Sequence, residues 1–478
     1  MNSNRTSMPL LRCPARPISS GGMIRPACFI GLDALPSHPR ISFVTSLDYP
    51  VSLAPLKATR FRWVLGLFLF LLTFLSYMDR VNLGVVTEQI MAEFNFTRID
   101  MGILQSCFFI GYAAMQIPAG ILAGVFKPNV VITTAVTSWS LFTIMTTRCS
   151  SFFSFAGVRA LFGVGEGPIF PASITLVGRW FNKTERARAS SLLVAGGFFG
   201  PVVGSGLTVA IMAALGWRAV FIIYGVAGLL IAVVWHTLAT ASPNDSQFVN
   251  EAEVAQIEGA INTGTVTTTK VAPWSKFLRC PQFWAIGIQF FITDYIMYVY
   301  LAWLPSYLLE AQKFSLSKMG VAASLPWAAL VAALLASGWF SDRLVAAGEC
   351  KRNARTYLAA PGLVLCSIFL YLASMAAIPA LNVLWLTLSL GSLGLAFTGS
   401  WGACHDLGGH YVGSVAGWMN FWGNLGGVSA PIVTASIASA YGWHAAILAT
   451  SGLALIGVAV WFLVKPDMPL PLSHSVKP

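Results

Sequence analysis

Runs of about 20 or more mostly apolar residues recur along most of this chain, and short polar segments separate them. A helix needs about 20 such residues to cross a bilayer, where only helices and closed barrels satisfy every backbone N–H and C=O group. Charged residues make up 10% of the 478 residues, against about 25% in an ordinary soluble domain. The sequence therefore predicts an all-α membrane protein and excludes a soluble globular enzyme.

The apolar runs form two sets of six. We expect a six-helix half over 61–239, a polar linker over 240–281, a second six-helix half over 282–464 and a short tail over 465–478. The predicted spans cover about 61–86, 100–124, 129–147, 152–177, 187–213 and 218–239 in the first half, and about 282–309, 318–341, 355–377, 380–403, 412–439 and 443–464 in the second.

An internal repeat supports the division into halves. The segment LGWRAVFIIYGVAGLLIAVVW ends the first set of spans, and YGWHAAILATSGLALIGVAVW ends the second. Duplicated halves that enclose a site near the bilayer midplane are typical of transporters. At one constant offset, Gly197, Gly200, Gly216, Trp217, Ala219 and Trp235 match Gly423, Gly426, Gly442, Trp443, Ala445 and Trp461.

Residues 1–60 differ from the rest of the chain because they are rich in proline and arginine and contain few acids. They hold no apolar core long enough for a signal peptide. We expect a disordered tail or a start codon placed too far upstream, with an organellar transit peptide as the alternative.

The net charge of +11 would suggest a nucleic-acid partner in a soluble protein. In a membrane protein, basic residues instead indicate orientation, because they are enriched in the loops on the cytoplasmic side. We expect no nucleic-acid partner, and we expect both termini and the linker to be cytoplasmic. The basic residues on that side are Arg179, Lys183, Arg186 and Arg188 after the fourth span, and Arg343, Lys351, Arg352 and Arg355 after the eighth.

Five charged residues interrupt the predicted spans: Asp79, Arg80, Arg159, Glu166 and Asp294. Each costs roughly 2.5 to 3.5 kcal/mol at a helix centre, so such charges usually serve a function. Neighbouring residues leave a helix about 100° apart, whereas residues seven apart return to nearly the same face. We therefore expect Arg159 and Glu166 to face one cavity, with a static buried network as the alternative.

Arginine and carboxylates in one cavity can do two things. The planar guanidinium binds a carboxylate through two charge-assisted hydrogen bonds. A buried acid can take up and release a proton. The charges therefore predict an anion clamp combined with proton coupling.

The eight cysteines and six histidines form no metal or catalytic pattern. We therefore expect no metal, no cofactor other than a coupling proton, and no catalytic residues. An embedded enzyme or a sensor is the disfavoured alternative.

Three segments resemble the anion:cation symporter branch of the major facilitator superfamily, over about residues 60–465. They are SYMDRVNLGVV in the first span, RALFGVGEGPIFPASITLVGRWFNKTERARA from residue 159, and WLPSYL from residue 303. The resemblance implies a major facilitator fold with about 12 helices and a monomer in the bacterial inner membrane. It implies import of an organic carboxylate, such as a hexuronate, aldonate or aldarate, by proton symport. An anion exchanger or a substrate/proton antiporter is the alternative.

The resemblance also implies roles for individual residues. Asp79 and Glu166 would bind protons, with Arg159 as their partner, and Arg80 would bind the substrate carboxylate. Further substrate contacts would come from Tyr77, Tyr112, Thr398, Ser400, Trp401 and Asn420.

Two departures from the family pattern stand out. The gating motif G-x-x-x-D-R is intact at Gly338, Asp342 and Arg343, but its first-half copy lacks the acid. The fifth span of family members commonly carries a glutamine, and this sequence has Gly197 near that position. We assign no family counterpart to Asp294. We interpret it as a polar residue near the outer end of its span, with a substrate contact as the alternative.

Overall fold

The computed structural model describes residues 57–182, 184–261, 273–467 and 470. Most of the predicted N-terminal tail lies outside these residues. In the described part every regular element is helical, which confirms the predicted all-α class. The first half contains α1 (Phe61–Phe94), α2 (Arg98–Val125), α3 (Pro128–Met145), α4 (Phe152–Glu166), α5 (Ile169–Trp180), α6 (Arg186–Leu215) and α7 (Trp217–Leu238).

The segment between the halves contains α8 (Glu251–Ile261) and the short α9 (Trp274–Phe277). The second half contains α10 (Pro281–Glu310), α11 (Leu316–Ala346), α12 (Lys351–Met375), α13 (Pro379–Gly408) and α14 (Val412–Trp461). Short 3₁₀ turns lie at Thr146–Arg148, Pro243–Asp245 and Gly409–Tyr411.

The number of membrane spans agrees with the predicted dozen. Within the described ranges, ten helical segments are long and apolar enough to cross a membrane, and α2 makes an eleventh although it bends by 46° before Pro118. Proline lacks the backbone N–H that a straight helix needs. The 50 residues of α14 break at Gly442, where φ is 83°, so this element supplies two spans and brings the total to twelve.

The repeat seen in the sequence has a structural basis in a sharp turn. Gly216 separates α6 from α7 with φ 82°, and Gly442 divides α14 with φ 83°. A side chain would be strained at such positive φ, which glycine adopts freely. The two matched glycines therefore make the same turn in the two halves.

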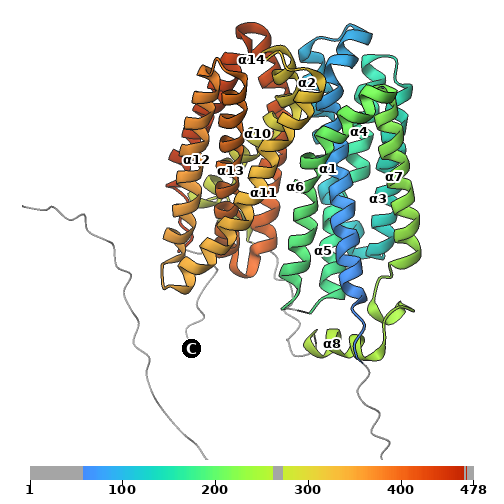
Figure 1. Cartoon of the computed structure of the whole chain (residues 1–478). Coiled ribbons are helices and arrows are strands. Elements are labelled where there is room, and N and C mark those ends of the chain that lie inside the picture. The colour runs from blue at the N-terminus through green and yellow to red at the C-terminus, as the bar shows by residue number, and fades with distance from the viewer. Residues whose placement is uncertain (1–56, 183, 262–272, 468–469, 471–478) are drawn as a thin grey trace, which may run out of the picture. The chain divides into compact units, whose positions relative to one another are not determined.

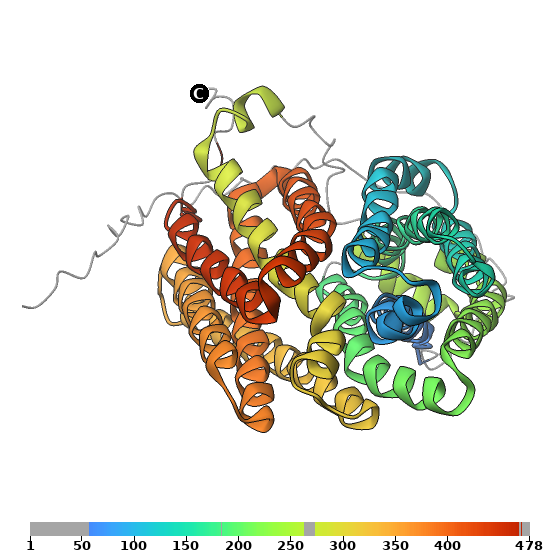
Figure 2. The same ribbon diagram turned by 90° about the horizontal axis from the view of Figure 1, so that it is seen from above.

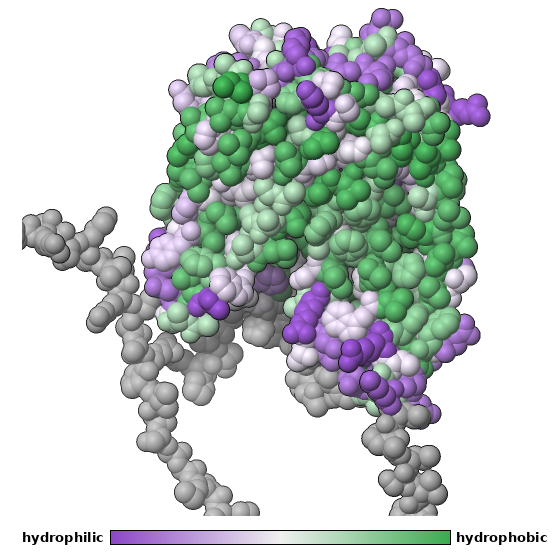
Figure 3. Space-filling model, viewed as in Figure 1, coloured by the Kyte–Doolittle hydropathy of each residue, from purple (hydrophilic) through white to green (hydrophobic). Residues whose placement is uncertain are grey.

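The two halves lie side by side, with α1–α7 in one bundle and α10–α14 in the other (Figures 1 and 2). Contacts between them run through α2 with α14, α6 with α11, and α1 with α10. Apolar side chains cover the flanks of the helices, and polar side chains gather at their two ends (Figure 3). This distribution suits a protein surrounded by lipid.

The halves pack closely at the end remote from α8. A Cβ on Gly84 of α1 would lie 2.6 Å from the carbonyl oxygen of Leu301 in α10, and one on Gly102 of α2 would lie 2.8 Å from that of Pro431 in α14. Small residues permit such close approach of membrane helices. At the opposite end the surface is hollowed between the halves (Figure 3). The described part of the protein is therefore closed at one end and open at the end that carries α8.

The helix α8 is attached to the first half by buried charges. Arg62, near the start of α1, binds Glu253 of α8 at 2.8 Å and Glu185 at 3.0 Å, and Glu253 is fully buried. The segment between the halves is thus anchored to one of them.

Candidate functional site

A cavity of about 140 Å³ lies between the two halves. From the first half, α1, α2, α5 and α6 contribute to its wall, together with the last residue of α4; from the second half, α10, α13 and α14 do so. Its polar lining consists of Thr73, Ser76, Tyr77, Arg80, Tyr112, Gln116 and Glu166 on one side, and of Asp294, Tyr298, Trp401, Asn420 and Asn424 on the other.

The centre of the first-half wall is an ion pair between Arg80 and Glu166. The Nε of Arg80 donates to Glu166 Oε1 at 2.9 Å, a second guanidinium N–H donates to the same oxygen, and the Ser76 hydroxyl donates to it at 2.6 Å. The other carboxylate oxygen, Oε2, is buried and has no hydrogen-bond partner among the described residues. Glu166 therefore binds Arg80 through one oxygen and keeps the second available.

Three aromatic rings surround the guanidinium of Arg80. Its central carbon lies 4.4 Å from the ring centre of Tyr77 and 4.8 Å from those of Phe108 and Tyr112. Such cation–π contacts stabilise a desolvated guanidinium. The rings also restrict its orientation, so that the fork is held at the cavity wall.

Asp79 and Arg159 do not line this cavity. The expectation that Arg159 and Glu166 project into one cavity is therefore wrong for Arg159. Seven residues of helix rise by about 10.5 Å, so the two side chains share a face but not a depth. Arg159 is buried beside Phe162, 4.9 Å from its ring centre, and its Nε has no hydrogen-bond partner in the described part of the chain.

Asp79 leaves α1 on a different side from Arg80, as the angle between neighbouring residues requires. It is buried and receives a weak hydrogen bond from Asn82 at 3.4 Å, while its Oδ2 finds no hydrogen-bond partner within the described ranges. The nearby Arg159 attracts it electrostatically, although no ion pair within 4.0 Å joins these two described residues. Asp79 and Arg159 thus form a second buried charge group, inside the first half.

Asp294 lies in the middle of α10 and lines the cavity, so its interpretation as a polar residue near the outer end of a span is wrong. The side chain is buried. Its position depends on Gly423 of α14, where a Cβ would lie 2.2 Å from Asp294 Oδ2. The sequence could not show this, because the surroundings of Asp294 follow from the packing of α10 against α14 and α1.

The second-half residues expected from the resemblance divide into two groups. Trp401 and Asn420 line the cavity. Thr398 instead shares a hydrogen bond of 2.6 Å with Ser337, and the fully buried Ser400 donates to Gln289 at 2.7 Å. The prediction that Thr398 and Ser400 contact substrate is not supported by their positions.

The reason lies in the orientation of α13. Its cavity face is occupied by Phe397 and Trp401, which are about one helical turn apart. The residues between them therefore point toward neighbouring helices.

Several lining residues were missed although helical spacing could have indicated them. Ser76 precedes Arg80 by one turn, Gln116 follows Tyr112 by one turn, and Asn424 follows Asn420 by one turn. Residues four apart share a helix face. A search one helical turn before and after each predicted contact residue would therefore have identified them.

The predicted gating motif lies at the end of α11, away from the cavity. The guanidinium of Arg343 lies 3.8 Å from the ring centre of Trp339, and no described atom lies within 4 Å of a Cβ placed on Gly338. The side chain of Asp342 is outside the described part of the structure. A gating role for this motif stays a prediction.

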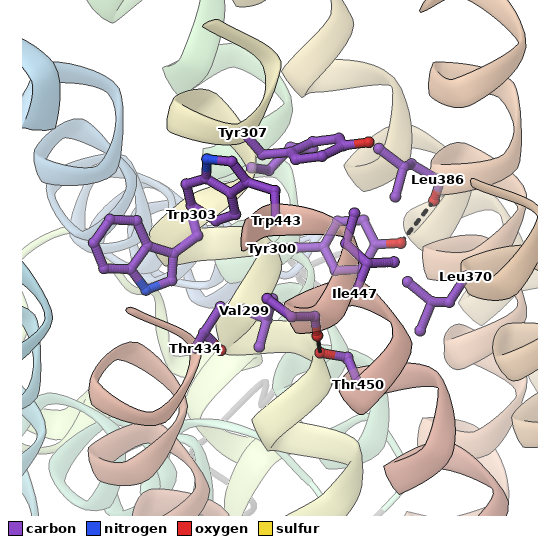
Figure 4. Close-up of a pocket in the computed structure, with 12 residues that line it drawn as sticks. Val299, Tyr300, Trp303, Tyr307, Leu370, Leu386, Thr434, Trp443, Ile447 and Thr450 are labelled. Carbon is purple, nitrogen blue, oxygen red and sulfur yellow. Dashed lines mark hydrogen bonds between the residues drawn. The ribbon is translucent and has the colours of Figure 1, made fainter. Parts of the chain in front are cut away.

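A second, smaller cavity of about 30 Å³ lies within the second half, near the closed end (Figure 4). Its wall is almost entirely apolar, and the Tyr300 hydroxyl in it donates to the carbonyl oxygen of Leu386 at 3.1 Å. A space of this size has room for only about two water molecules. The larger cavity between the halves is therefore the candidate site for an organic ligand.

Comparison with known proteins agrees with this architecture. A family model described as Major Facilitator Superfamily matches residues 69–431. The chain is 32% identical over 405 residues to the chloroplastic ascorbate transporter of Arabidopsis thaliana, covering 84% of this chain and 74% of that protein. It is 28% identical over 432 residues to the D-galactonate transporter of Escherichia coli O6:H1, covering 88% of this chain and 99% of that protein.

The fold is also found in a crystal structure of a bacterial homolog of the human lysosomal transporter Spinster, in an inward-facing and unoccupied conformation. The TM-score is 0.73 at 16% sequence identity, over 85% of this chain and 98% of the other. The relatives are transporters, including sugar-acid and other anion transporters, so the chain is a transporter and not an enzyme. The resemblance described from the sequence is confirmed, and the chain belongs to the Major Facilitator Superfamily.

Proposed function

We propose that this protein is a secondary active transporter that imports an organic carboxylate, such as a sugar acid, together with protons. The observation that carries the proposal is the Arg80–Glu166 pair on the wall of the cavity between the halves. The names of the relatives, which include a D-galactonate transporter, support a sugar acid as the substrate class.

The geometry suggests how a proton and an anion would be coupled. Glu166 binds the guanidinium of Arg80, so a substrate carboxylate must compete with it. A proton on Glu166, whose Oε2 has no other partner among the described residues, would remove the competing charge and leave the fork of Arg80 to the substrate. Binding of the proton and binding of the anion would then favour each other.

Asp79 and Arg159 would provide a second proton site. Asp79 is next to Arg80 on α1 but faces the interior of the first half, so a proton there changes the charge near Arg80 without touching the substrate. Arg159 is the cation that would stabilise Asp79 when it is ionised. In this scheme Arg80 binds the substrate, while Asp79 binds a proton at a position that the substrate does not reach.

Transport would proceed by alternating access, with the closed and open ends exchanging. By the positive-inside rule, the basic loops, α8 and both termini would lie on the cytoplasmic side of a bacterial inner membrane. The open end would then face the cytoplasm. We expect a monomer that requires only the bilayer, protons and a small organic anion.

Uptake into proteoliposomes tests the proposal. Labelled galactonate should accumulate when a pH gradient, acidic outside, is imposed on vesicles that contain no substrate, and this result would exclude an exchanger. Glu166→Gln should abolish gradient-driven accumulation while it spares exchange of labelled for unlabelled substrate. Glu258→Gln, the same change on the exposed side of α8, is the matched control. Gradient-driven uptake that survives in Glu166→Gln would refute the assigned proton site.

A further inference from the structure

Asp294 is an acid in the cavity for which the proposed mechanism has no use. Its side chain is buried and lines the second-half wall, and among the described residues it makes no hydrogen bond or ion pair. A buried carboxylate without a partner is costly, because the lost hydration is not replaced. Such a group at a cavity wall is suited to receive hydrogen bonds from a ligand.

The internal repeat shows that Asp294 takes the place of an aromatic residue. A Cβ on Gly200 of α6 would lie 2.6 Å from the carbonyl oxygen of Phe74, and one on the matched Gly426 of α14 would lie 2.7 Å from that of Phe291. Tyr77 follows Phe74 by three residues, and Asp294 follows Phe291 by three. The two halves therefore present a phenol on the Arg80 side and a carboxylate opposite.

The charges of the cavity wall argue against a second carboxylate on the substrate. Among the described residues, the charged lining consists of one cation, Arg80, and two acids, Glu166 and Asp294. Glu166 already binds Arg80, which leaves Asp294 without a cation of its own in this lining. A second ligand carboxylate placed beside Asp294 would find no cation in this lining to compensate for its lost hydration, which disfavours binding.

The surroundings of Asp294 suit hydroxyl groups. Asn420 and Asn424 lie one turn apart on α14 and both line the cavity, and Gly423 between them is the residue that makes room for Asp294. Amide and carboxylate oxygens accept hydrogen bonds from hydroxyl groups, and the amide N–H groups can donate to them. One wall of the cavity is thus built for a polyhydroxy chain.

We propose that Asp294 is a specificity-determining residue that accepts hydrogen bonds from hydroxyl groups at the end of the substrate remote from its carboxylate. The preferred substrate is then a polyhydroxy monocarboxylate, and a dicarboxylate of the same length is rejected. This inference rests on the proposed function, because it takes Arg80 as the site of the single carboxylate.

Gluconate and glucarate form a matched pair for the test, since they share a six-carbon hydroxylated chain. Gluconate ends in a hydroxyl group where glucarate has a second carboxylate. Each is used at pH 7 to inhibit exchange of labelled galactonate in proteoliposomes. Gluconate should inhibit at a concentration at least about tenfold lower than glucarate. In Asp294→Asn the ratio of the two inhibitory concentrations should fall below about threefold, because the new amide N–H groups can donate to the second carboxylate of glucarate and no longer leave that wall to hydroxyl groups.

Controls keep the outcomes distinct. Asp100→Asn makes the same chemical change at a helix cap outside the cavity and should keep the tenfold ratio. If Asp294→Asn does not fold, Asp294→Ser serves as the second variant. Equal inhibition by the two acids in the unmodified protein, or an unchanged ratio in the variants, would overturn the assignment of Asp294 while transport stands. Failure of the unmodified protein to move any of the three sugar acids would instead reject the proposed function.

Discussion

Replacing Arg98 by Gln should shift the protein toward a state that is open at the end remote from α8. Arg98 of α2 binds Glu310, the last residue of α10, through its Nε at 3.2 Å and through a second guanidinium N–H. Glu310 also accepts a hydrogen bond from the indole of Trp443 at 2.8 Å. Because α2 and α10 belong to different halves, this ion pair joins the halves at the closed end.

The repeat supplies a matched control within the same protein. Glu93, the equivalent of Glu310 in the first half, accepts a hydrogen bond from Trp217 at 2.8 Å and binds Arg218. The residue that matches Arg218 in the second half is His444, which leaves Glu310 to pair across the interface. Arg218→Gln therefore removes the same kind of ion pair, but one that lies inside a single half.

The magnitude follows from the geometry. The side chains of Arg98 and Glu310 are 32% and 20% exposed, so the pair is partly screened by solvent. A two-pronged pair of this kind contributes about 1 to 1.4 kcal/mol. Its loss should raise the ratio of molecules that are open at this end to molecules that are closed there by about five- to tenfold. Arg98 also attracts Glu88, which lies beside Glu310, so Arg98→Gln removes the cation that both acids share.

The assay is a distance measurement between spin labels in a background without other reactive cysteines. Labels at positions 150 and 377, which are exposed and lie in different halves away from α8, report on the closed end. Arg98→Gln should increase the population with the longer distance, and Arg218→Gln should not. Equal shifts in the two variants, or none in Arg98→Gln, would refute the role of this pair in joining the halves.

Three further changes test other parts of the structure. Arg80→Lys keeps the charge but loses the planar fork and its ring contacts, so the apparent affinity for galactonate should fall about tenfold or more in exchange assays; undiminished affinity would contradict the clamp. Asp79→Asn should abolish gradient-driven uptake and leave the affinity nearly unchanged, since Asp79 does not line the cavity; a large loss of affinity would argue against a separate proton site. Gly84→Ala places a Cβ 2.6 Å from the Leu301 carbonyl oxygen and should destabilise the closed end by about 1 to 3 kcal/mol in the same spin-label assay. Gly157→Ala, with open space around it, should have no effect; equal effects of the two glycine changes would show that close packing at Gly84 does not hold the closed end.

Much of the fold can be predicted from the chain because it depends on local patterns. The length of each apolar run is matched to the bilayer, and the matched glycines at 216 and 442 mark the same turn in both halves. The presence of Arg80 and Glu166 within spans likewise indicates a functional cavity, since burying such charges in lipid is costly.

Which charges share a cavity is settled only by the packing of helices. Helical periodicity gives the angle of a side chain on its own helix, but not the depth at which two helices meet or which face meets a partner. Arg159 shares a face with Glu166 yet lies near Asp79, outside the cavity lining. Asp294 comes to line the cavity opposite Arg80 because Gly423, more than a hundred residues later in the chain, leaves it room.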